Sequence, residues 1–380
     1  MRIDPAIEAK YSRTRLKGGE VLLTLVGSVG QVAVASKSLK GFNVARAVAV
    51  IHPSHDVEPE WLAWCLRAPL SQHLLGSRAN TTVQTTINLK DLRALPIPLP
   101  PEIERKEIIA VLGGLDDCIS ILRETNTTLE AMAQAIFKSW FVDFDPVRAK
   151  AEGRQPERMD AATAALFPDS FEESELGLVP KGWHVGSIED IADYLNGLAL
   201  QKFPPSEDSW LPVIKIAQLR RGNTHGADRA SADIKKDYIV HSGDVLFSWS
   251  GTLEVEIWCG GKGALNQHLF KVTSKNFPKW FYLLWTKAHL KNFREIAASK
   301  ATTMGHIQRK HLTEAKVVIP PDDVLNGAGA FIQSILDEWL VNAEEIQTLT
   351  QLRDTLLPKL ISGEVRLPEA ESIVRSAVNA

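Results

Sequence analysis

The chain has 380 residues, of which 44% are apolar and 23% charged, a composition typical of a globular protein with two or three domains. Its formal net charge of −3 disfavours, taken alone, a nucleic-acid partner. No run approaches the roughly 18 apolar residues of a membrane span, and residues 1–20 hold no apolar stretch of signal-peptide length, so the sequence predicts a cytoplasmic protein with no membrane partner.

The first hundred residues carry the signals of a small globular unit. A turn made by Gly19 and Glu20 leads into an apolar, β-branched run at 21–26, which predicts a strand. The amphipathic segment 61–75 predicts a helix. The prolines at 100 and 101 then end the last strand and set the entry to a helix, so we expect a first domain over 1–101.

A long helix is predicted over 102–141. Its apolar positions alternate between spacings of four and three residues, a heptad seam of about 35 residues that would span about 50 Å as a helix. Asn126 is the polar position of this seam, as a residue that fixes helix register would be. The seam consists of Ile108, Leu112, Leu115, Ile119, Leu122, Asn126, Leu129, Ala133, Ile136 and Trp140.

The stretch "SWFVDFDPVRAKAEGRQP" (139–156) changes abruptly from aromatic to charged residues. We expect Trp140 to close the seam, and Phe141 and Phe144 to pack where the helix meets a second domain or its partner helix. Asp143 and Asp145 are interpreted as helix terminators rather than catalytic acids. The segment 142–180 is expected to be a linker.

The second half of the chain carries the same signals in the same order. A strand is predicted over 245–249 and a helix over 280–296, within a second domain at 181–321. A second long helix is expected over 322–365, followed by a tail over 366–380. The seam of this helix is rougher and consists of Ile332, Leu336, Trp339, Ala343, Ile346, Thr350, Arg353, Leu357 and Leu360.

These parallels amount to an internal repeat. The numbering offset stays between 219, which relates Trp61 to Trp280, and 224, which relates Gly19 to Gly243. Chance matches would not hold so constant an offset, so the chain contains two copies of one unit. We expect a mixed α+β fold in which two globular domains are joined by two long, antiparallel, coiled-coil-like helices with pseudo-two-fold symmetry.

Basic residues gather in two stretches of the expected second domain. Residues 287–316 hold seven Lys or Arg and two acids, a local net charge of +5. Residues 214–229 hold four basic residues and one acid, Asp228. One such run is most simply a solvated face, but two runs in one domain favour a polyanionic partner.

Signatures of catalysis and metal binding are missing from the sequence. There is no P-loop, no GxSxG, no strand-linked GxGxxG and no Asp/Asn-Pro-Pro-Tyr/Phe run of the amino-methyltransferase type. His52 and His55 lack a third ligand at metal-binding spacing. The three cysteines, Cys65, Cys118 and Cys259, have no CxxC spacing and are expected to be buried free thiols. The sequence predicts a protein that binds rather than catalyses.

Several motifs stand out along the chain: "GGEVLLTLVGSVG", "SGDVLFSWSGT", both Pro-Pro endings, "LRDTLLPKLISGEVRL" and above all "SWFVDFDPVRAKAEGRQPE" with "LFPDSFEESELGLVPKGW". Through these motifs the chain resembles the specificity subunits of type I restriction-modification systems over essentially its whole length. The resemblance implies that each globular unit is a target-recognition domain for one half of a split DNA sequence. The helices would set the half-site spacing and dock modification subunits.

The resemblance also implies the partners. They would be double-stranded DNA, two modification subunits that bind S-adenosylmethionine and methylate adenine at N6, and restriction/motor subunits. This chain would be a non-enzymatic subunit with no cofactor of its own, associated with the nucleoid of a prokaryotic cell through DNA.

Polar and basic loop residues are the candidate DNA-binding residues, since Arg and Lys bind guanine edges or phosphates while Asn and Gln pair with adenine. In the second domain they are Lys215, Gln218, Arg220, Arg221, Asn223, Ser250, Thr252, Asn266, Gln267, His268, Thr302, Thr303, His306, Arg309 and Lys310. In the first domain the matching positions are Ser28, Asn43, Arg46, Thr81, Thr82 and Lys90.

The two copies differ at their start. Sixty residues separate Trp183 from Gly243 in the second copy, whereas eighteen residues precede Gly19 in the first. We therefore expect the first target-recognition domain to be incomplete at its N-terminal side and its half-site recognition to be weakened. The alternative function is a truncated homologue that acts as an interaction scaffold or decoy, binding modification subunits without full DNA specificity.

Overall fold

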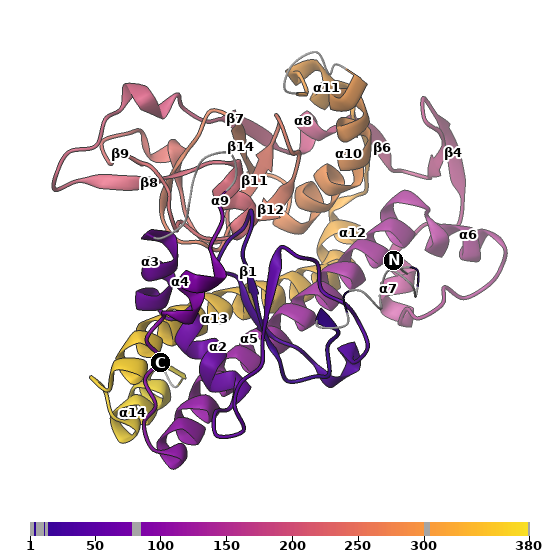
Figure 1. Ribbon diagram of the computed structural model, residues 1–380. Coiled ribbons are helices and arrows are strands. Elements are labelled where there is room, and N and C mark those ends of the chain that lie inside the picture. The colour runs from indigo at the N-terminus through magenta and orange to yellow at the C-terminus, as the bar shows by residue number, and fades with distance from the viewer. Residues whose placement is uncertain (1–3, 5–10, 12–13, 78–84, 300–304, 379–380) are drawn as a thin grey trace. The chain divides into compact units, whose positions relative to one another are not determined.

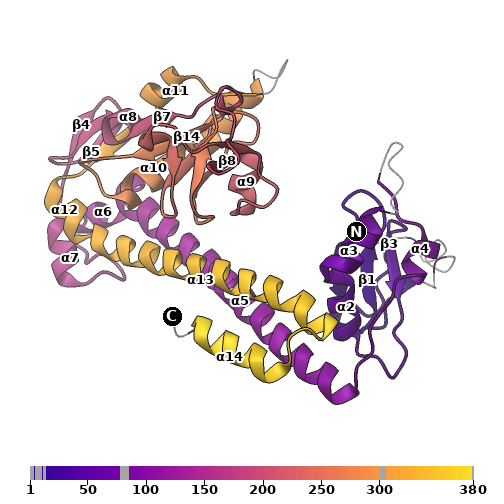
Figure 2. The ribbon, with the colours of Figure 1, turned by 90° about the vertical axis from the view of Figure 1, so that its left-hand side faces the viewer.

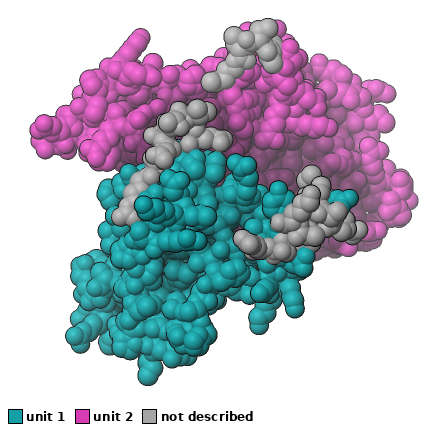
Figure 3. Space-filling model, viewed as in Figure 1, with its two compact units in different colours: residues 1–121, 348–380 teal, residues 122–347 magenta. Residues whose placement is uncertain are grey.

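The computed structural model describes residues 4, 11, 14–77, 85–299 and 305–378, and the chain divides into two compact units (Figure 3). Unit 1 comprises residues 1–121 with 348–380, and unit 2 comprises residues 122–347. Two long helices, α5 (Glu102–Phe137) and α13 (Gly329–Ser362), contribute to both units. The fold is a mixture of helices and strands, as predicted. Among the helices described, none has both the length and the apolar character needed to span a membrane.

Unit 1 contains a small antiparallel sheet covered by helices. Strands β1 (Val21–Thr24), β2 (Val32–Val34) and β3 (Val48–Ile51) pair in the order β2-β1-β3. Alternate side chains of β1, Val21 and Leu23, are completely buried because they share the face that packs against the helices. The remaining elements are η2 (Lys37–Leu39), α2 (Pro59–Arg67), α3 (Pro69–Ser77), α4 (Leu89–Arg93) and α14 (Leu367–Val378).

Unit 2 is built on two four-stranded sheets (Figure 1). One has the order β12-β11-β14-β7, from β7 (Asp193–Asn196), β11 (Val245–Ser248), β12 (Val255–Ile257) and β14 (Leu269–Thr273). The other has the order β10-β13-β8-β9, from β8 (Trp210–Ile214), β9 (Arg229–Ser231), β10 (Ile239–Val240) and β13 (Gly263–Leu265). In this second sheet β8 and β13 are parallel neighbours.

Further strand pairs and short helices complete unit 2. The pairs are β4 (Phe171–Ser174) with β5 (Gly177–Pro180), and β6 (His184–Ser187) with β15 (Lys316–Ile319). The helices are α6 (Asp145–Ala151), α7 (Ala161–Leu166), α8 (Ile188–Ile191), α9 (Ile216–Arg221), α10 (Lys279–Ser299), α11 (Arg309–Glu314) and α12 (Asp322–Gly327), with short turns η4 (Leu200–Lys202) and η5 (Lys236–Tyr238).

The internal repeat is visible in the hydrogen bonds of the two units. Each glycine-acid turn has a glycine with positive φ, 90° at Gly19 and 88° at Gly243. The Glu20 carboxylate accepts the backbone N–H of Lys17 at 2.6 Å, and the Asp244 carboxylate accepts that of His241 at 2.8 Å. The acid thus holds the turn closed in both copies, which explains why both carry an acid directly after the glycine.

The sheets repeat as well. The order β2-β1-β3 in unit 1 corresponds to β12-β11-β14 in unit 2, where β7 adds one more strand beside β14. The last residue of β1 and the last residue of β11 each carry a hydroxyl that makes the same bond. Thr24 donates to the carbonyl of Ser28, and Ser248 donates to that of Thr252. Each unit therefore presents a tight loop, 24–28 or 248–252, at the same place in its fold.

The two long helices pair in antiparallel fashion, as predicted. Within unit 2 they run side by side (Figure 2), and the Asn126 amide donates to the Trp339 carbonyl at 2.9 Å while Asn342 donates to Asn126 at 3.0 Å. Within unit 1, Arg353 pairs with Asp116 at 2.5 Å. Seam residues such as Leu112 and Ile332 are fully buried. Asn126 is thus a register residue with a polar partner, Asn342, that the seam did not reveal.

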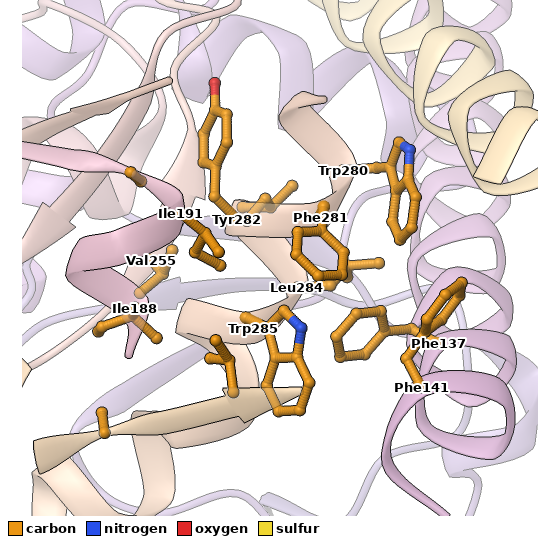
Figure 4. Close-up of a cluster of buried hydrophobic side chains, with 14 of the residues drawn as sticks. Phe137, Phe141, Ile188, Ile191, Val255, Trp280, Phe281, Tyr282, Leu284 and Trp285 are labelled. Atoms are coloured by element: carbon orange, nitrogen blue, oxygen red, sulfur yellow. The ribbon is translucent and has the colours of Figure 1, made fainter. Parts of the chain in front are cut away.

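Aromatic side chains join the end of α5 to the core of unit 2. Measured between ring centroids, Phe141 lies 5.2 Å from Trp280 (Figure 4). It lies 5.9 Å from Trp183. The start of α13 fits against the same cluster: a Cβ atom at Gly329 would lie 2.3 Å from the ring of Trp280, so the helix approaches closely because it begins with glycine. The predicted packing of Phe141 and Phe144 against the second globular unit is confirmed, since both are buried in its core.

The role expected for Asp145 is wrong. The helical path ends in a π-helical turn, η3 (Lys138–Val142), followed by Phe144 in the left-handed conformation with φ 58°. Asp145 and Pro146 then open α6, because proline and an acid both suit the first turn of a helix. Asp143 does act at the helix end, where its N–H donates to the Lys138 carbonyl at 2.8 Å.

The segment expected to be a linker is folded. It contains α6, α7, β4 and β5, and Val147, Phe167 and Val179 belong to the same core as the β12-β11-β14-β7 sheet. The segment carries many charged residues, and the buried apolar residues that anchor it are too widely spaced to form a periodic pattern.

We predict that replacing Asn126 with leucine destabilises the chain by about 1–3 kcal/mol, because the buried Asn342 amide loses its acceptor. The double variant Asn126→Leu/Asn342→Leu should regain most of that loss, since both polar groups leave together. Urea unfolding of the two single variants and the double variant measures the coupling. Losses that simply add would contradict the pairing.

We predict that Phe141→Ala lowers the free energy of unfolding by about 3–5 kcal/mol, because it opens a cavity among packed rings. Phe331→Ala is the matched control, since Phe331 is 51% exposed on α13 and its removal should change stability by less than about 0.5 kcal/mol. Thermal or urea unfolding followed by tryptophan fluorescence checks both. Similar losses for the two variants would contradict this account of the junction.

Candidate nucleic-acid interface

The candidate interface of unit 2 begins where two parallel strands end. Ile214 of β8 lies opposite Leu265 of β13, so the chain leaves both strands at the same edge of the sheet. Lys215 and Asn266 are the next residues, and the Asn266 N–H donates to the Ile214 carbonyl at 3.2 Å. The fold therefore brings together two predicted residues from segments about fifty positions apart in the sequence.

Asn266 braces the loop that follows β13 rather than facing solvent. It is 3% exposed, its carbonyl oxygen accepts the N–H of His268 at 3.2 Å, and its amide donates to Gln267 at 2.8 Å. Both side-chain groups are used inside the loop. We conclude that Asn266 shapes the loop, while Gln267 and His268 are the half-buried side chains that it presents.

Three segments meet beside this loop in what we call the Trp249 corner, formed by Asn196, Trp249, Ser250, His268 and His306. The Trp249 indole N–H donates to Asn196 Oδ1 at 2.9 Å, and Ser250 Oγ lies 3.0 Å from His268 Nδ1. The Trp249 ring lies 5.9 Å from that of His268 and 6.3 Å from that of His306. Backbone bonds fix the frame, because Gly251 donates to the Gly305 carbonyl at 2.9 Å.

The Trp249 corner contains three predicted residues and two that the sequence did not single out. Ser250, His268 and His306 were predicted, whereas Trp249 and Asn196 were missed. Trp249 was read as the end of a strand, and Asn196 lies in a segment that has no match in the first copy. Aligning the repeats would have signalled Trp249, because the first copy has Leu25 at that position.

The predicted residues on and next to α9 are paired with neighbouring residues of unit 2. Lys215 pairs with Asp228, Arg220 pairs with Glu254 at 3.3 Å, and the 5% exposed Gln218 accepts the N–H of Lys215 at 3.3 Å. The end of α9 borders a groove of unit 2 whose lining includes Arg123, Arg220, Arg221, Trp339 and Gln347.

The loop after α9 is held in place within unit 2. Gln347 of α13 donates to the Gly222 carbonyl at 3.0 Å. Asn223 stabilises the following turn by accepting the N–H of His225 at 3.0 Å. Arg221 and Asn223 thus belong to the surface beside the helix pair.

The basic run 287–316 is less available for DNA than its count suggests. Lys287 is buried between Glu130 and Glu256. Burial acts to lower the pKa of Lys287, but the two carboxylates outweigh it and raise the pKa; burial also raises the pKa of Glu256. Arg309 pairs with Glu189 at 2.8 Å and Lys316 with Glu175 at 2.9 Å. The local charge of +5 is therefore a poor measure of the surface.

The other predicted residues are placed as follows. Thr252 and Lys310 are exposed in unit 2. In unit 1, Ser28, Arg46 and Lys90 are exposed and Asn43 is half-buried. Thr81, Thr82, Thr302 and Thr303 lie outside the described residues.

Unit 1 has the same backbone frame around its candidate loop. Gly27 donates to the Thr85 carbonyl at 3.2 Å, as Gly251 does to Gly305 in unit 2. Val26 bridges to Thr86 as Ser250 bridges to His306. The first copy thus positions Ser28 as the second positions Thr252.

Cysteine and metal chemistry add little to this picture. Burial raises the pKa of the thiols of Cys65 and Cys259 to about 12. Cys118 is exposed, so the expectation of three buried thiols is wrong; it lies on the outer face of α5 between seam residues. Within the described part of the chain, no three His, Cys, Asp or Glu side chains are grouped closely enough to hold a metal ion.

Comparison with known proteins yields one family. A family model described as "Type I restriction modification DNA specificity domain" matches residues 4–131 and 180–352. The chain is 25% identical to the type I restriction enzyme MjaIX specificity subunit of Methanocaldococcus jannaschii, over 92% of this chain and 78% of that protein. It is 24% identical to the HindI specificity subunit of Haemophilus influenzae, over 93% of this chain and 88% of the relative.

A solved structure supports the fold. The crystal structure of the type I restriction-modification S subunit from M. genitalium aligns with a TM-score of 0.50 and 16% identity, covering 92% of this chain and 84% of that one. The family model covers most of the chain in two segments, and these segments contain the repeated sheets and loops described above. The chain therefore belongs to the DNA-specificity family of type I restriction-modification systems and is a specificity subunit.

Proposed function

We propose that each globular unit of this specificity subunit reads one half of a bipartite DNA target. The observation that carries the proposal is the repeated frame: both units end a central strand in the same hydroxyl-braced loop, bonded to the same neighbouring segment. A protein that reads two half-sites with one fold needs a constant frame with variable side chains. The candidate loop residues supply groups that bind base edges and phosphates.

The paired helices are proposed to set the distance between half-sites. The 36 residues of α5 correspond to a length of about 54 Å, enough to span half-sites one DNA turn apart, about 34–36 Å. The Asn126–Asn342 and Asp116–Arg353 pairs oppose sliding of one helix along the other, because a shift would leave these polar groups without partners.

The same helices are proposed to dock two modification subunits. Apolar side chains remain exposed on them, including Ile103, Ile121 and Met132 on α5 and Phe331 and Val341 on α13. Adenine flipping and methyl transfer would then take place in the partner, which would bind S-adenosylmethionine, and a restriction/motor subunit would join for cleavage. This chain would contribute recognition and no catalytic group.

The alternative function, a scaffold without DNA specificity, would use the helix surfaces but not the loops. Capture of a modification subunit is expected for both functions. Sequence-specific DNA binding by the resulting complex is expected only for the specificity subunit and separates the two.

We predict that Arg309→Ala/Lys310→Ala lowers DNA affinity and reduces the slope of log K against log salt by about two, because two phosphate contacts are lost. Arg309 can exchange its partner for a phosphate, since its side chain is 68% exposed in the pair with Glu189. The control is Lys106→Ala, an exposed lysine paired with Glu102 along α5. Titrations from low to high salt, with the modification subunit present, check this; an unchanged slope contradicts a DNA-binding role for α11.

We predict that Val341→Asp weakens capture of the modification subunit at least about tenfold, because a charge would be buried in an apolar contact. Val341 is 59% exposed, so unfolding of the isolated chain should be almost unchanged. Leu178→Asp is the matched control, because Leu178 is equally exposed but lies on the β4–β5 hairpin. Equal capture by both variants, measured by surface plasmon resonance, would refute docking at this face.

A further inference from the structure

The two recognition units have one backbone frame but different side chains at three contacting positions. The backbone N–H of Trp249 donates to the His268 carbonyl at 3.3 Å, and the backbone N–H of Leu25 donates to the Ala47 carbonyl at 2.7 Å. Ile307 donates to the Trp249 carbonyl at 3.0 Å, and Ile87 donates to the Leu25 carbonyl at 2.9 Å. These bonds make Trp249, His268 and His306 the structural counterparts of Leu25, Ala47 and Thr86.

The substitutions are concerted. In unit 2 the three positions carry an indole ring and two imidazoles that contact it, at centroid distances of 5.9 Å and 6.3 Å. In unit 1 they carry an aliphatic residue, a methyl group and a hydroxyl, and Leu25 is 8% exposed within the core. The frame does not require aromatic side chains here, because the first copy builds it without them. The frame therefore leaves the side chain at this position free to vary, and in unit 2 the Trp249 ring also packs on the core beside Phe270, at a centroid distance of 6.0 Å.

The chemistry of the Trp249 corner defines what it can contact. The Asn196 carbonyl oxygen is engaged by the indole N–H, which directs the exposed Asn196 side chain alongside the Trp249 ring. Its amide nitrogen then offers N–H donors next to an apolar aromatic face. A base edge that places a hydrogen-bond acceptor beside a methyl group complements this arrangement, and in the major groove that edge is O4 and the C5-methyl of thymine.

We propose that the Trp249 corner reads a thymine in the half-site of unit 2, with Trp249 against the methyl group and the Asn196 amide donating to O4. His268 and His306 act as positioning residues whose rings contact the indole, and Ser250 orients His268. The inference rests on the proposed function, since it names the base contacted by one recognition unit. Unit 1, with Leu25 at this position, reads its half-site by other groups.

The test replaces the corner with the side chains of the other copy. The full chain, bound to its modification subunit, selects duplexes from a randomised DNA library, first as the wild type and then as Trp249→Leu/His268→Ala/His306→Thr. The variant is expected to lose a thymine preference at one position of one half-site, with the other half-site unchanged. The same motif from both proteins, or a loss confined to a base other than thymine, overturns the inference.

Further measurements separate the possible failures. Uracil lacks the C5-methyl group, so replacing that thymine by deoxyuridine should weaken wild-type binding about tenfold and leave Trp249→Leu binding unchanged. Equal binding of both duplexes by the wild type overturns the inference.

Trp210→Leu, which removes a 40% exposed tryptophan elsewhere in unit 2, should retain the motif. If the triple variant unfolds, His268→Ala/His306→Thr serves instead, with an expected partial loss of the thymine preference; an unchanged preference then overturns the inference. A wild type that selects no motif refutes the proposed function itself.

Discussion

Phe141 ends the first long helix with its ring 5.2 Å from Trp280 and 5.9 Å from Trp183, and this contact ties the helix to the recognition unit that follows it. A loop on a loosely attached domain could not hold a fixed distance from anything else. The aromatic rings remove that freedom, because rotation of the unit about the helix end would open a cavity in a close-packed core. The buried Lys287 bonds to Glu130 of α5 and to Glu256 of β12, and so adds a charged link between helix and sheet next to the aromatic one.

Packing and polar pairing have different roles in this design. Apolar seam residues hold the two helices together. Leucine and isoleucine nevertheless tolerate a shift of one heptad, because each side chain then packs into a similar hole on the facing helix. The Asn126–Asn342 pair in unit 2 and the Asp116–Arg353 pair in unit 1 do not tolerate such a shift. Stability thus comes from the seam, whereas the register, and with it any fixed spacing, comes from a few buried or half-buried polar groups.

Much of the fold follows from the sequence because its signals are periodic or repeated. The heptad seam predicted both long helices, and the offset between Gly19 and Gly243 predicted the second sheet from the first. The folded segment 142–180 was missed because its anchors, such as Val147, Phe167 and Val179, are too widely spaced to form a helical or strand pattern. The candidate site was predicted in part: residue type indicated His268, but the burial of Gln218 and the ion pairs of Lys287 depend on tertiary contacts that no local pattern encodes.

The repeat shows how one backbone frame can carry different loop side chains. The loop frame is held by backbone bonds and by the Thr24 or Ser248 hydroxyl, none of which depends on the side chains at positions 25 and 249. Leucine in one copy and tryptophan in the other are therefore both compatible with the same fold. Changes at the Trp249 corner can alter what is contacted while the turn acids, the seam and the aromatic junction stay fixed. On the proposed function, specificity and spacing would be encoded in separate sets of residues, each of which could change without disturbing the other.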